Sequence, residues 1–237
     1  MIKEIVNYDE LKTQLAFYAE DDYREFVKKG IPCDRPILGV RIPQVRELAK
    51  LVPNENIEDL LKNKPVALEE VLFRGFLICR LPYEKIMSDL DGKSWFDSQL
   101  ECIDNWCTCD VFCASFKKIK KHKSEFFDTK IGKLLEDPRE YAVRVGLVLL
   151  KSYYIEPDYL AVMFDRTERL KQRDEYYIKM AIAWLLAECF VKYPDETLSY
   201  LKVSNLPKWT YNKTISKIRD SFRVDEEMKD LLLKLRK

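Results

Sequence analysis

Residues Tyr176–Leu201 read YYIKMAIAWLLAECFVKYPDETLSYL, in which a long apolar segment is followed by a proline and a more polar segment. The apolar residues recur with the 3.6-residue period of an α-helix. Pro194 stands where a second helix would begin. A proline in the first helical turn costs no hydrogen bond, because that N–H has no partner within the helix. The stretch therefore predicts a helical hairpin.

Two further stretches, Val71–Leu90 and Tyr141–Phe164, repeat this order of apolar helix, proline and second helix. In each of the three copies, a basic residue stands between apolar neighbours near the start of the first helix. These basic residues are Arg74, Arg144 and Lys179. The last two lie 35 residues apart and the first two lie twice as far apart, so that a missing copy falls at Asp110. The chain therefore contains a repeat of about 35 to 40 residues.

Hairpins of this kind bury their apolar faces only by stacking on one another. We therefore expect an all-α fold, a curved α-solenoid of helical hairpins. We expect a single domain over residues 1–237, with divergent N-terminal helices in 1–66 and stacked hairpins in 67–237. The repeated positions Arg74, Asp110, Arg144 and Lys179 would then share one concave, locally positive surface. Such a groove suits duplex DNA or an acidic protein segment.

The composition excludes several classes of protein. The chain has only six glycines and no GxGxxG or GxxxxGK[ST] motif, which argues against a Rossmann or P-loop nucleotide site. One histidine and the lack of CxxC pairs argue against a metal site, and we expect no metal and no cofactor. Charges near the N-terminus, short apolar runs and an odd number of cysteines lead us to expect a cytoplasmic protein with reduced thiols and no contact with a membrane.

Basic residues are concentrated in two parts of a chain whose net charge is only +1. Seven lysines and two acidic residues lie between Ser115 and Lys133, and a second basic region spans residues 202–237. A solvated helix face explains such clusters as well as a nucleic-acid footprint does. If the partner is DNA, we expect phosphate contacts from Lys117, Lys118 and Lys121.

Trp106 and Asp110 are four residues apart and would project from the same side of a helix. This spacing places an indole ring beside a carboxylate. The pattern alone favours Trp106 as a core residue and Asp110 as a helix cap or a member of an ion pair. Trp184, one hairpin beyond Arg144, is likewise consistent with a core residue.

Five motifs in order then suggest a family. They are Gly39–Arg46 (GVRIPQVR), Asp104–Asp110 (DNWCTCD), Arg144, Tyr177–Trp184 (YIKMAIAW) and Lys217–Ser221 (KIRDS). Over nearly its whole length the chain resembles the AlkD-like DNA alkylation repair proteins, which are alkylpurine DNA glycosylases built from HEAT-like repeats. The resemblance implies a monomeric DNA repair enzyme. It would hydrolyse the glycosidic bond of cationic N3- or N7-alkylpurines in duplex DNA, without swinging the base into a pocket.

The resemblance also implies roles for individual residues. Asp110 matches a catalytic aspartate, and Trp106 and Trp184 match tryptophans that flank the sugar of the lesion. Tyr23 is the match for a tyrosine that contacts the lesion region, and Arg144 matches an arginine that holds a phosphate. The resemblance, the repeat positions, the first motif and the lysine-rich region together predict a set of DNA contacts. These are Arg41, Arg74, Arg144, Lys179, Lys117, Lys118 and Lys121.

Two alternatives remain open at this point. Where other members carry an arginine shortly after the repeat tryptophan, this chain has Ala187, and the family contains branches that keep the fold without base excision. The chain is therefore also consistent with a non-catalytic protein that recognises damaged or branched DNA. A helical solenoid that serves as a protein-interaction scaffold is the third interpretation.

Overall fold

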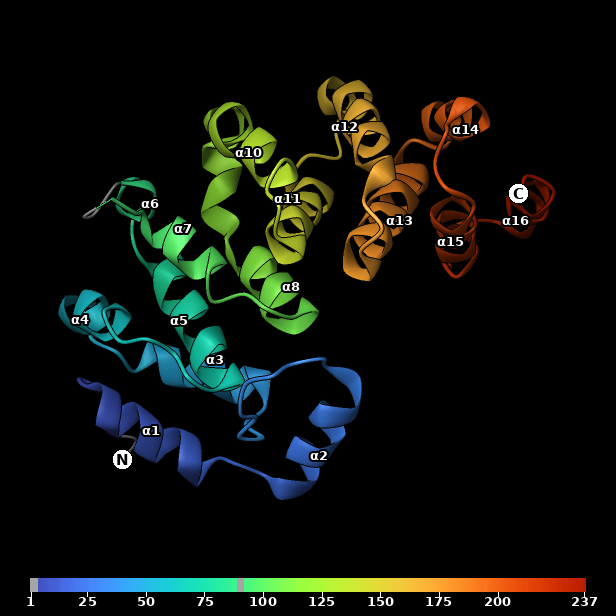
Figure 1. Ribbon diagram of the computed structural model, residues 1–237. Helices are drawn as coiled ribbons and strands as arrows, with labels where there is room; N and C mark the ends of the chain where they lie inside the picture. Colours follow the sequence, from blue (N-terminus) through green and yellow to red (C-terminus); the bar gives the residue numbers. More distant parts are fainter. Residues whose placement is uncertain (1–3, 89–91) are drawn as a thin grey trace. The chain divides into compact units, whose positions relative to one another are not determined.

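The computed structural model describes residues 4–88 and 92–237 (Figure 1). All regular elements in these residues are helices, and this part of the chain contains no β-strand. The predicted all-α class is confirmed. The chain forms two compact units, an N-terminal unit that ends at Lys118 and a C-terminal unit that spans Ile119–Lys237. The expected single domain over 1–237, with its division after residue 66, and the continuous solenoid stay predictions.

The N-terminal unit is built around one buried helix, α5 (Leu68–Arg80), which is buried on all sides from Leu68 to Ile78. α5 packs against the four helices α3, α4, α7 and α8. The other helices of the unit are α1 (Tyr8–Phe17), α2 (Asp21–Gly30), α3 (Ile42–Lys50), the 3-10 helix Asn54–Asn56, α4 (Ile57–Leu61), α6 (Tyr83–Met87), α7 (Trp95–Leu100) and α8 (Trp106–Ser115).

A glycine allows α5 and α8 to approach closely. A Cβ atom at Gly75 would lie 3.2 Å from the amide nitrogen of Gln99 and 3.3 Å from the Phe112 ring. Behind this contact the Phe112 and Phe116 rings stack with their centroids 5.8 Å apart, and both are buried. The contact fixes α8 against the central helix, and α8 carries Trp106 and Asp110.

The C-terminal unit contains a row of three helices in which α13 (Tyr176–Lys192) packs against both α11 (Glu140–Tyr153) and α15 (Lys208–Arg219). Pro157 and Pro194 open α12 (Pro157–Arg169) and α14 (Pro194–Val203), as the sequence predicts. The remaining helices are the 3-10 helix Lys117–Lys121 at the junction of the units, α9 (Lys123–Phe126), the π-helix Phe127–Ile131, α10 (Gly132–Leu135), the 3-10 helix Leu170–Gln172 and α16 (Glu226–Leu233).

Two of the repeated arginines differ from expectation. Arg74 and Arg144 are 7% and 6% exposed, so neither guanidinium is openly accessible to a phosphate as we expected. The Arg74 guanidinium donates to the carbonyl of Leu61 and the hydroxyl of Ser98, and that of Arg144 donates to the carbonyl of Tyr177. A buried guanidinium is stable only with such partners, and these arginines therefore join neighbouring segments.

No helix in residues 4–88 and 92–237 combines the length and the apolar character that crossing a membrane requires.

Candidate functional site

The helix that carries Trp106 and Asp110 has a well-defined start. The side chain of Asn105, which is fully buried, caps α8 by accepting from the backbone N–H of Thr108 at 3.0 Å. Its amide group donates to the carboxylate of Asp104 at 2.8 Å. This cap fixes the first turn of α8, so that Trp106 and Asp110 project from one side of the helix as the sequence predicts.

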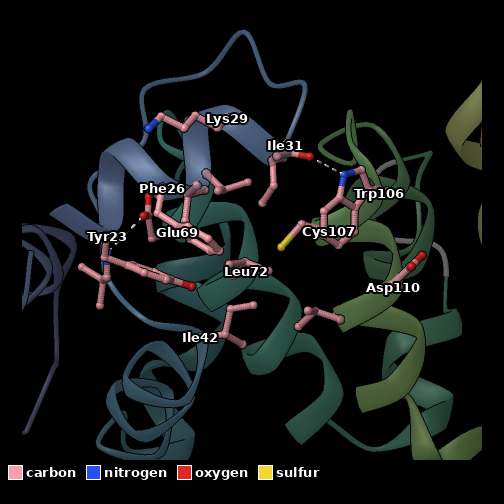
Figure 2. A pocket seen from close by; sticks show the side chains of 15 residues that line it. Tyr23, Phe26, Lys29, Ile31, Ile42, Glu69, Leu72, Trp106, Cys107 and Asp110 are labelled. Carbon is pink, nitrogen blue, oxygen red and sulfur yellow. Dashed lines mark hydrogen bonds between the residues drawn. The ribbon is translucent and has the colours of Figure 1, made fainter. Parts of the chain in front are cut away.

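Trp106 connects α8 to α2, a helix far away in sequence. Its indole N–H donates to the carbonyl of Gly30, the last residue of α2, at 3.2 Å (Figure 2). Trp106 is partly exposed and is therefore not the core residue that the pattern alone allowed. The hydrogen bond fixes the orientation of the indole ring at the edge of a gap between α2 and α8.

A cavity of about 420 Å³ occupies this gap, and we call it the N-terminal cavity. Its walls come from α2 and the loop after it, the start of α3, the start of α5, and α8, all within the N-terminal unit. Most lining side chains are apolar, including Phe26, Ile42 and Leu72 (Figure 2). Asp110 is half-buried and lies at the edge of the cavity, where Figure 2 shows its carboxylate directed away from Leu72.

Glu69, on α5, shapes one wall of the N-terminal cavity. It is 2% exposed, and its carboxylate accepts from the backbone N–H groups of Leu38, Gly39 and Val40 at 3.0, 2.8 and 3.2 Å. Gly39 has φ +91°, which side-chain-bearing residues rarely adopt. The carboxylate therefore holds the loop between α2 and α3 in one conformation, and this loop places α2 over the cavity.

Tyr23, on α2, packs against the guanidinium group of Arg41. The Arg41 guanidinium lies 4.5 Å from the centre of the Tyr23 ring and forms two hydrogen bonds with the Glu20 carboxylate, at 2.8 and 2.9 Å. Figure 2 shows the Tyr23 hydroxyl directed into the cavity. Burial, and to a lesser degree the neighbouring Cys107, raise the pKa of Tyr23. At neutral pH this hydroxyl is therefore protonated and is able to donate a hydrogen bond.

Cys107 also lines the N-terminal cavity, and its thiol is protonated at neutral pH. Burial raises its pKa to about 12, and the nearby carboxylates of Asp110 and Glu69 contribute further. A protonated thiol is neither a nucleophile nor a metal ligand. The Asp110 carboxylate is therefore the group at the edge of the cavity that is able to take part in a reaction.

The C-terminal unit carries the second predicted tryptophan, Trp184, which is partly exposed beside a cavity of about 340 Å³. The ammonium group of Lys151 lies 3.4 Å from the centre of its ring. At the same cavity, Arg223 forms hydrogen bonds with the two carboxylate oxygens of Glu188 at 2.9 and 3.0 Å. One face of the indole is thus already covered by a cation.

A cationic cluster lies near this second cavity. Burial lowers the pKa of Lys217, the charges of Lys213 and Arg144 lower it further, and the carboxylate of Asp220 raises it. Lys217 therefore lies near two other cations and one carboxylate. The excess of positive charge attracts an anion such as a phosphate.

The other predicted DNA contacts have partners within the protein to different degrees. Lys179 forms an ion pair with Asp174 at 2.7 Å and lies 5.3 Å from the centre of the Trp209 ring. Lys118 donates to the carbonyl of Cys79 at 3.1 Å. The exposed residues among these predicted contacts are Arg41, Lys117 and Lys121.

A model of the protein family described as DNA alkylation repair enzyme matches residues 11–218. The chain belongs to this family. The matched range begins within α1 and ends within α15, and so it includes both units. The family is named for enzymatic repair of alkylated DNA, and DNA is therefore the substrate that membership implies. A comparison with curated proteins finds no match to the chain.

Within this DNA alkylation repair chain, three predicted site residues meet at one cavity. Tyr23, Trp106 and Asp110 all line the N-terminal cavity. Trp184, Arg144 and Lys179 belong to the other unit, and their convergence with Asp110 stays a prediction.

Sequence reasoning missed the walls of the N-terminal cavity, including Glu69 and Cys107. An acidic residue inside the apolar segment Leu68–Ile78 was a usable signal for Glu69, because a carboxylate in a buried helix needs donors. No sequence period indicated the cavity itself.

Proposed function

We propose that the chain is a DNA N-glycosylase that hydrolyses the glycosidic bond of purines made cationic by alkylation at N3 or N7. The proposal is supported above all by the position of the Asp110 carboxylate, beside Trp106 at the edge of the N-terminal cavity, in a member of the DNA alkylation repair family. This is a specific form of the activity that the family name describes.

Because the alkylated purine is already cationic, a site with a single carboxylate is sufficient for hydrolysis of the glycosidic bond. When the bond between C1′ and the base nitrogen breaks, the base takes the bonding electrons and becomes neutral, so that no general acid is required. Positive charge develops on the sugar as an oxocarbenium-like ion. A water molecule then forms the new bond to C1′ and loses its proton to the Asp110 carboxylate or to solvent. The products are the free base and an abasic site.

Asp110 and Trp106 would act on the charge that develops. A fixed carboxylate stabilises an oxocarbenium ion more strongly than the neutral sugar that precedes it, and such differential stabilisation lowers the barrier. The face of an indole ring adds a cation–π attraction of about 0.5–2 kcal/mol. The hydrogen bond to the Gly30 carbonyl holds the Trp106 ring in place for this contact.

DNA binding in this proposal uses both units. We propose that the helices form a monomeric solenoid of HEAT-like repeats, and that Trp184 and the cluster around Lys217 also contact the DNA. Exposed Arg41, Lys117 and Lys121 would contact phosphates, and affinity would fall steeply with salt.

The test compares release of 7-methylguanine from a duplex by the wild-type chain and by Asp110→Asn. We expect a loss of roughly 10²-fold or more in the rate of release, with DNA affinity retained. Asp59→Asn is the matched control, because Asp59 is an exposed carboxylate of α4 that pairs with Lys62 and does not line the N-terminal cavity. Equal rates for wild type and Asp110→Asn would refute the mechanism.

One observation favours a second candidate, a non-catalytic protein that recognises damaged DNA. The Lys151 ammonium group lies over the Trp184 ring, on which a cationic sugar would otherwise stack. Salt-sensitive binding to alkylated duplex without release of any methylated purine would support this candidate.

A further inference from the structure

An open hollow of about 490 Å³ lies on α15, and we call it the α15 hollow. α15 packs against α13 on one side and α16 on the other (Figure 1). Most of the lining comes from one face of α15, because its members recur at intervals of four residues. The lining residues are Lys208, Trp209, Asn212, Lys213, Ser216 and Arg236. None of them lines the N-terminal cavity or the cavity beside Trp184.

Positive charge in the α15 hollow is not neutralised by neighbouring carboxylates. Lys208 and Arg236 are exposed and Lys213 is half-buried. Within residues 4–88 and 92–237 none of the three forms an ion pair with an aspartate or a glutamate, and no acidic residue lines the hollow. Three unpaired cations around one hollow attract an anion such as a phosphate.

The exposed ring of Trp209 borders these cations. Trp209 is 41% exposed and lines the α15 hollow. Two residues of α13 contact the indole, and neither of them lines the hollow. The Tyr176 ring lies 5.8 Å from it between centroids, and the ammonium group of Lys179 lies 5.3 Å from the centre of the ring. These contacts support the indole, and part of its surface stays accessible from the hollow.

The segment that carries Arg236 is held against α15. The side-chain amide of Asn212 donates to the backbone carbonyl of Lys237 at 2.8 Å, and its oxygen accepts from the Lys237 backbone N–H at 3.0 Å. The ammonium group of Lys237 donates to the carbonyl of Ser204 at 3.1 Å and lies 4.2 Å from the centre of the Tyr211 ring. Arg236 therefore stays beside α15, and less ordering is required when a ligand binds.

We propose that the α15 hollow binds single-stranded DNA, with an unpaired base stacked on Trp209 and backbone phosphates beside Lys208, Lys213 and Arg236. A cationic groove with exposed aromatic rings is a common means of binding a single strand. A duplex fits this combination less well, because neighbouring base pairs cover the faces of its bases. The inference goes beyond the proposed function, since it concerns a different site and needs no cleavage of a glycosidic bond.

The first experiment measures binding of two fluorescently labelled strands to the full chain by anisotropy at physiological salt. One is a short deoxyuridine strand, and the other is an abasic strand of the same length, which has the same phosphates but no bases. We expect the deoxyuridine strand to bind at least about fivefold more tightly, because only its bases stack. Trp209→Ala should remove this preference, whereas Trp209→Phe should retain most of it.

Equal affinity of the wild type for the two strands would overturn the proposal, and so would an undiminished preference in folded Trp209→Ala. Tighter binding of a uridine RNA strand of the same length would overturn the assignment to DNA. Phe17→Ala is the matched control, because Phe17 is 77% exposed on α1 and does not line the hollow. Circular dichroism establishes that each variant is folded.

A second variant tests the phosphate contacts and decides the matter if Trp209→Ala unfolds. Lys208→Met should reduce the slope of log affinity against log salt by about 0.7 for the deoxyuridine strand. Lys202→Met is its control, because Lys202 is exposed near the end of α14 and does not line the hollow. An unchanged slope in folded Lys208→Met would overturn the phosphate site.

The last measurement separates this inference from the proposed function. Binding of a blunt duplex and release of 7-methylguanine are measured for wild type, Trp209→Ala and Asp110→Asn. We expect Trp209→Ala to lose strand binding with duplex binding and base release unchanged, and Asp110→Asn to show the reverse for strand binding and release. Equal losses of strand and duplex affinity in Trp209→Ala would overturn the inference. If the wild type releases no base, the proposed function fails, and strand binding alone decides the inference.

Discussion

The guanidinium of Arg35 and the carboxylate of Asp104, 69 residues apart in sequence, form an ion pair with 2.5 Å between Nε and Oδ2. Arg35 also donates to the carbonyls of Pro65 at 2.9 Å and Cys102 at 3.4 Å. The other oxygen of Asp104 accepts from Asn105, which caps α8. The pair therefore joins the loop after α2 to the first turn of the helix that carries Trp106 and Asp110, and so it fixes two walls of the N-terminal cavity relative to each other.

Replacing Arg35 should destabilise the chain more than replacing a surface arginine. We expect Arg35→Met to lower the free energy of unfolding by about 1–3 kcal/mol, because two carbonyls and a carboxylate lose their donor. Arg169→Met is the control, since Arg169 pairs with Asp165 on the exposed side of α12 and such pairs contribute about 0–1 kcal/mol. Urea denaturation measures both values, and equal losses would contradict the role assigned to Arg35.

Gly39 should tolerate no side chain. A Cβ atom there would lie 2.8 Å from the Cβ of Arg24 and would also meet the carbonyl of Glu20. We expect Gly39→Ala to cost about 3 kcal/mol or more, from backbone strain and this overlap together. Gly92 has φ +93° but no described heavy atom within 4 Å of its added Cβ, so Gly92→Ala should cost only the backbone term of about 1–2 kcal/mol. Urea denaturation measures the loss of stability in the two alanine variants. Similar losses would show that the residues around Gly39 shift to make room for the added methyl group.

The helices and the pairing of Trp106 with Asp110 were predictable because both depend on short sequence spacing. The apolar period of Tyr176–Lys192 and the proline at 194 predicted α13 and the start of α14. The four-residue spacing of Trp106 and Asp110 needed only a helix to bring the two side chains together. Predictions from such local patterns hold in the folded chain because each pattern describes a single helix or the turn that follows it.

The burial of Arg74 and the N-terminal cavity were not predictable in the same way. A basic residue between apolar neighbours occurs both on a groove and in a buried helix, and only the positions of Leu61 and Ser98 distinguish the two for Arg74. The cavity depends on a loop held by Glu69 from another helix, and this contact has no sequence period.

Replacing Arg74 should lower the stability of the chain, whereas replacing Lys117 should change only its binding to DNA. Arg74→Met should lower stability by about 1–3 kcal/mol or more, because buried carbonyl and hydroxyl groups lose their donor. It should leave the dependence of DNA affinity on salt unchanged. Lys117→Met should leave stability unchanged within about 0.5 kcal/mol. If Lys117 contacts a phosphate, its loss should reduce the slope of log affinity against log salt by about 1. Urea denaturation and salt titrations of duplex binding check the pair, and a reduced salt slope in folded Arg74→Met would contradict its structural role.

Stability should fall at alkaline pH because of buried thiols. Burial raises the pKa of Cys79, Cys107 and Cys189 from 9.0 to about 12. Between these two values the unfolded chain loses thiol protons that the folded chain retains, and rising pH therefore favours unfolding. Each thiol contributes a slope of up to about 1.4 kcal/mol per pH unit, and its stabilising effect is fully present below pH 9.

Urea denaturation of wild type and Cys107→Ala between pH 7 and pH 10.5 measures this contribution. The alanine variant should be less stable at pH 7, because a buried side chain is truncated, but its stability should fall less steeply above pH 9. Below pH 8 the two curves should run parallel, since the thiol is protonated in both the folded and the unfolded chain. Parallel curves above pH 9 as well would mean that Cys107 ionises in the folded chain as readily as in the unfolded one. That result would contradict the burial of the Cys107 thiol beside the N-terminal cavity.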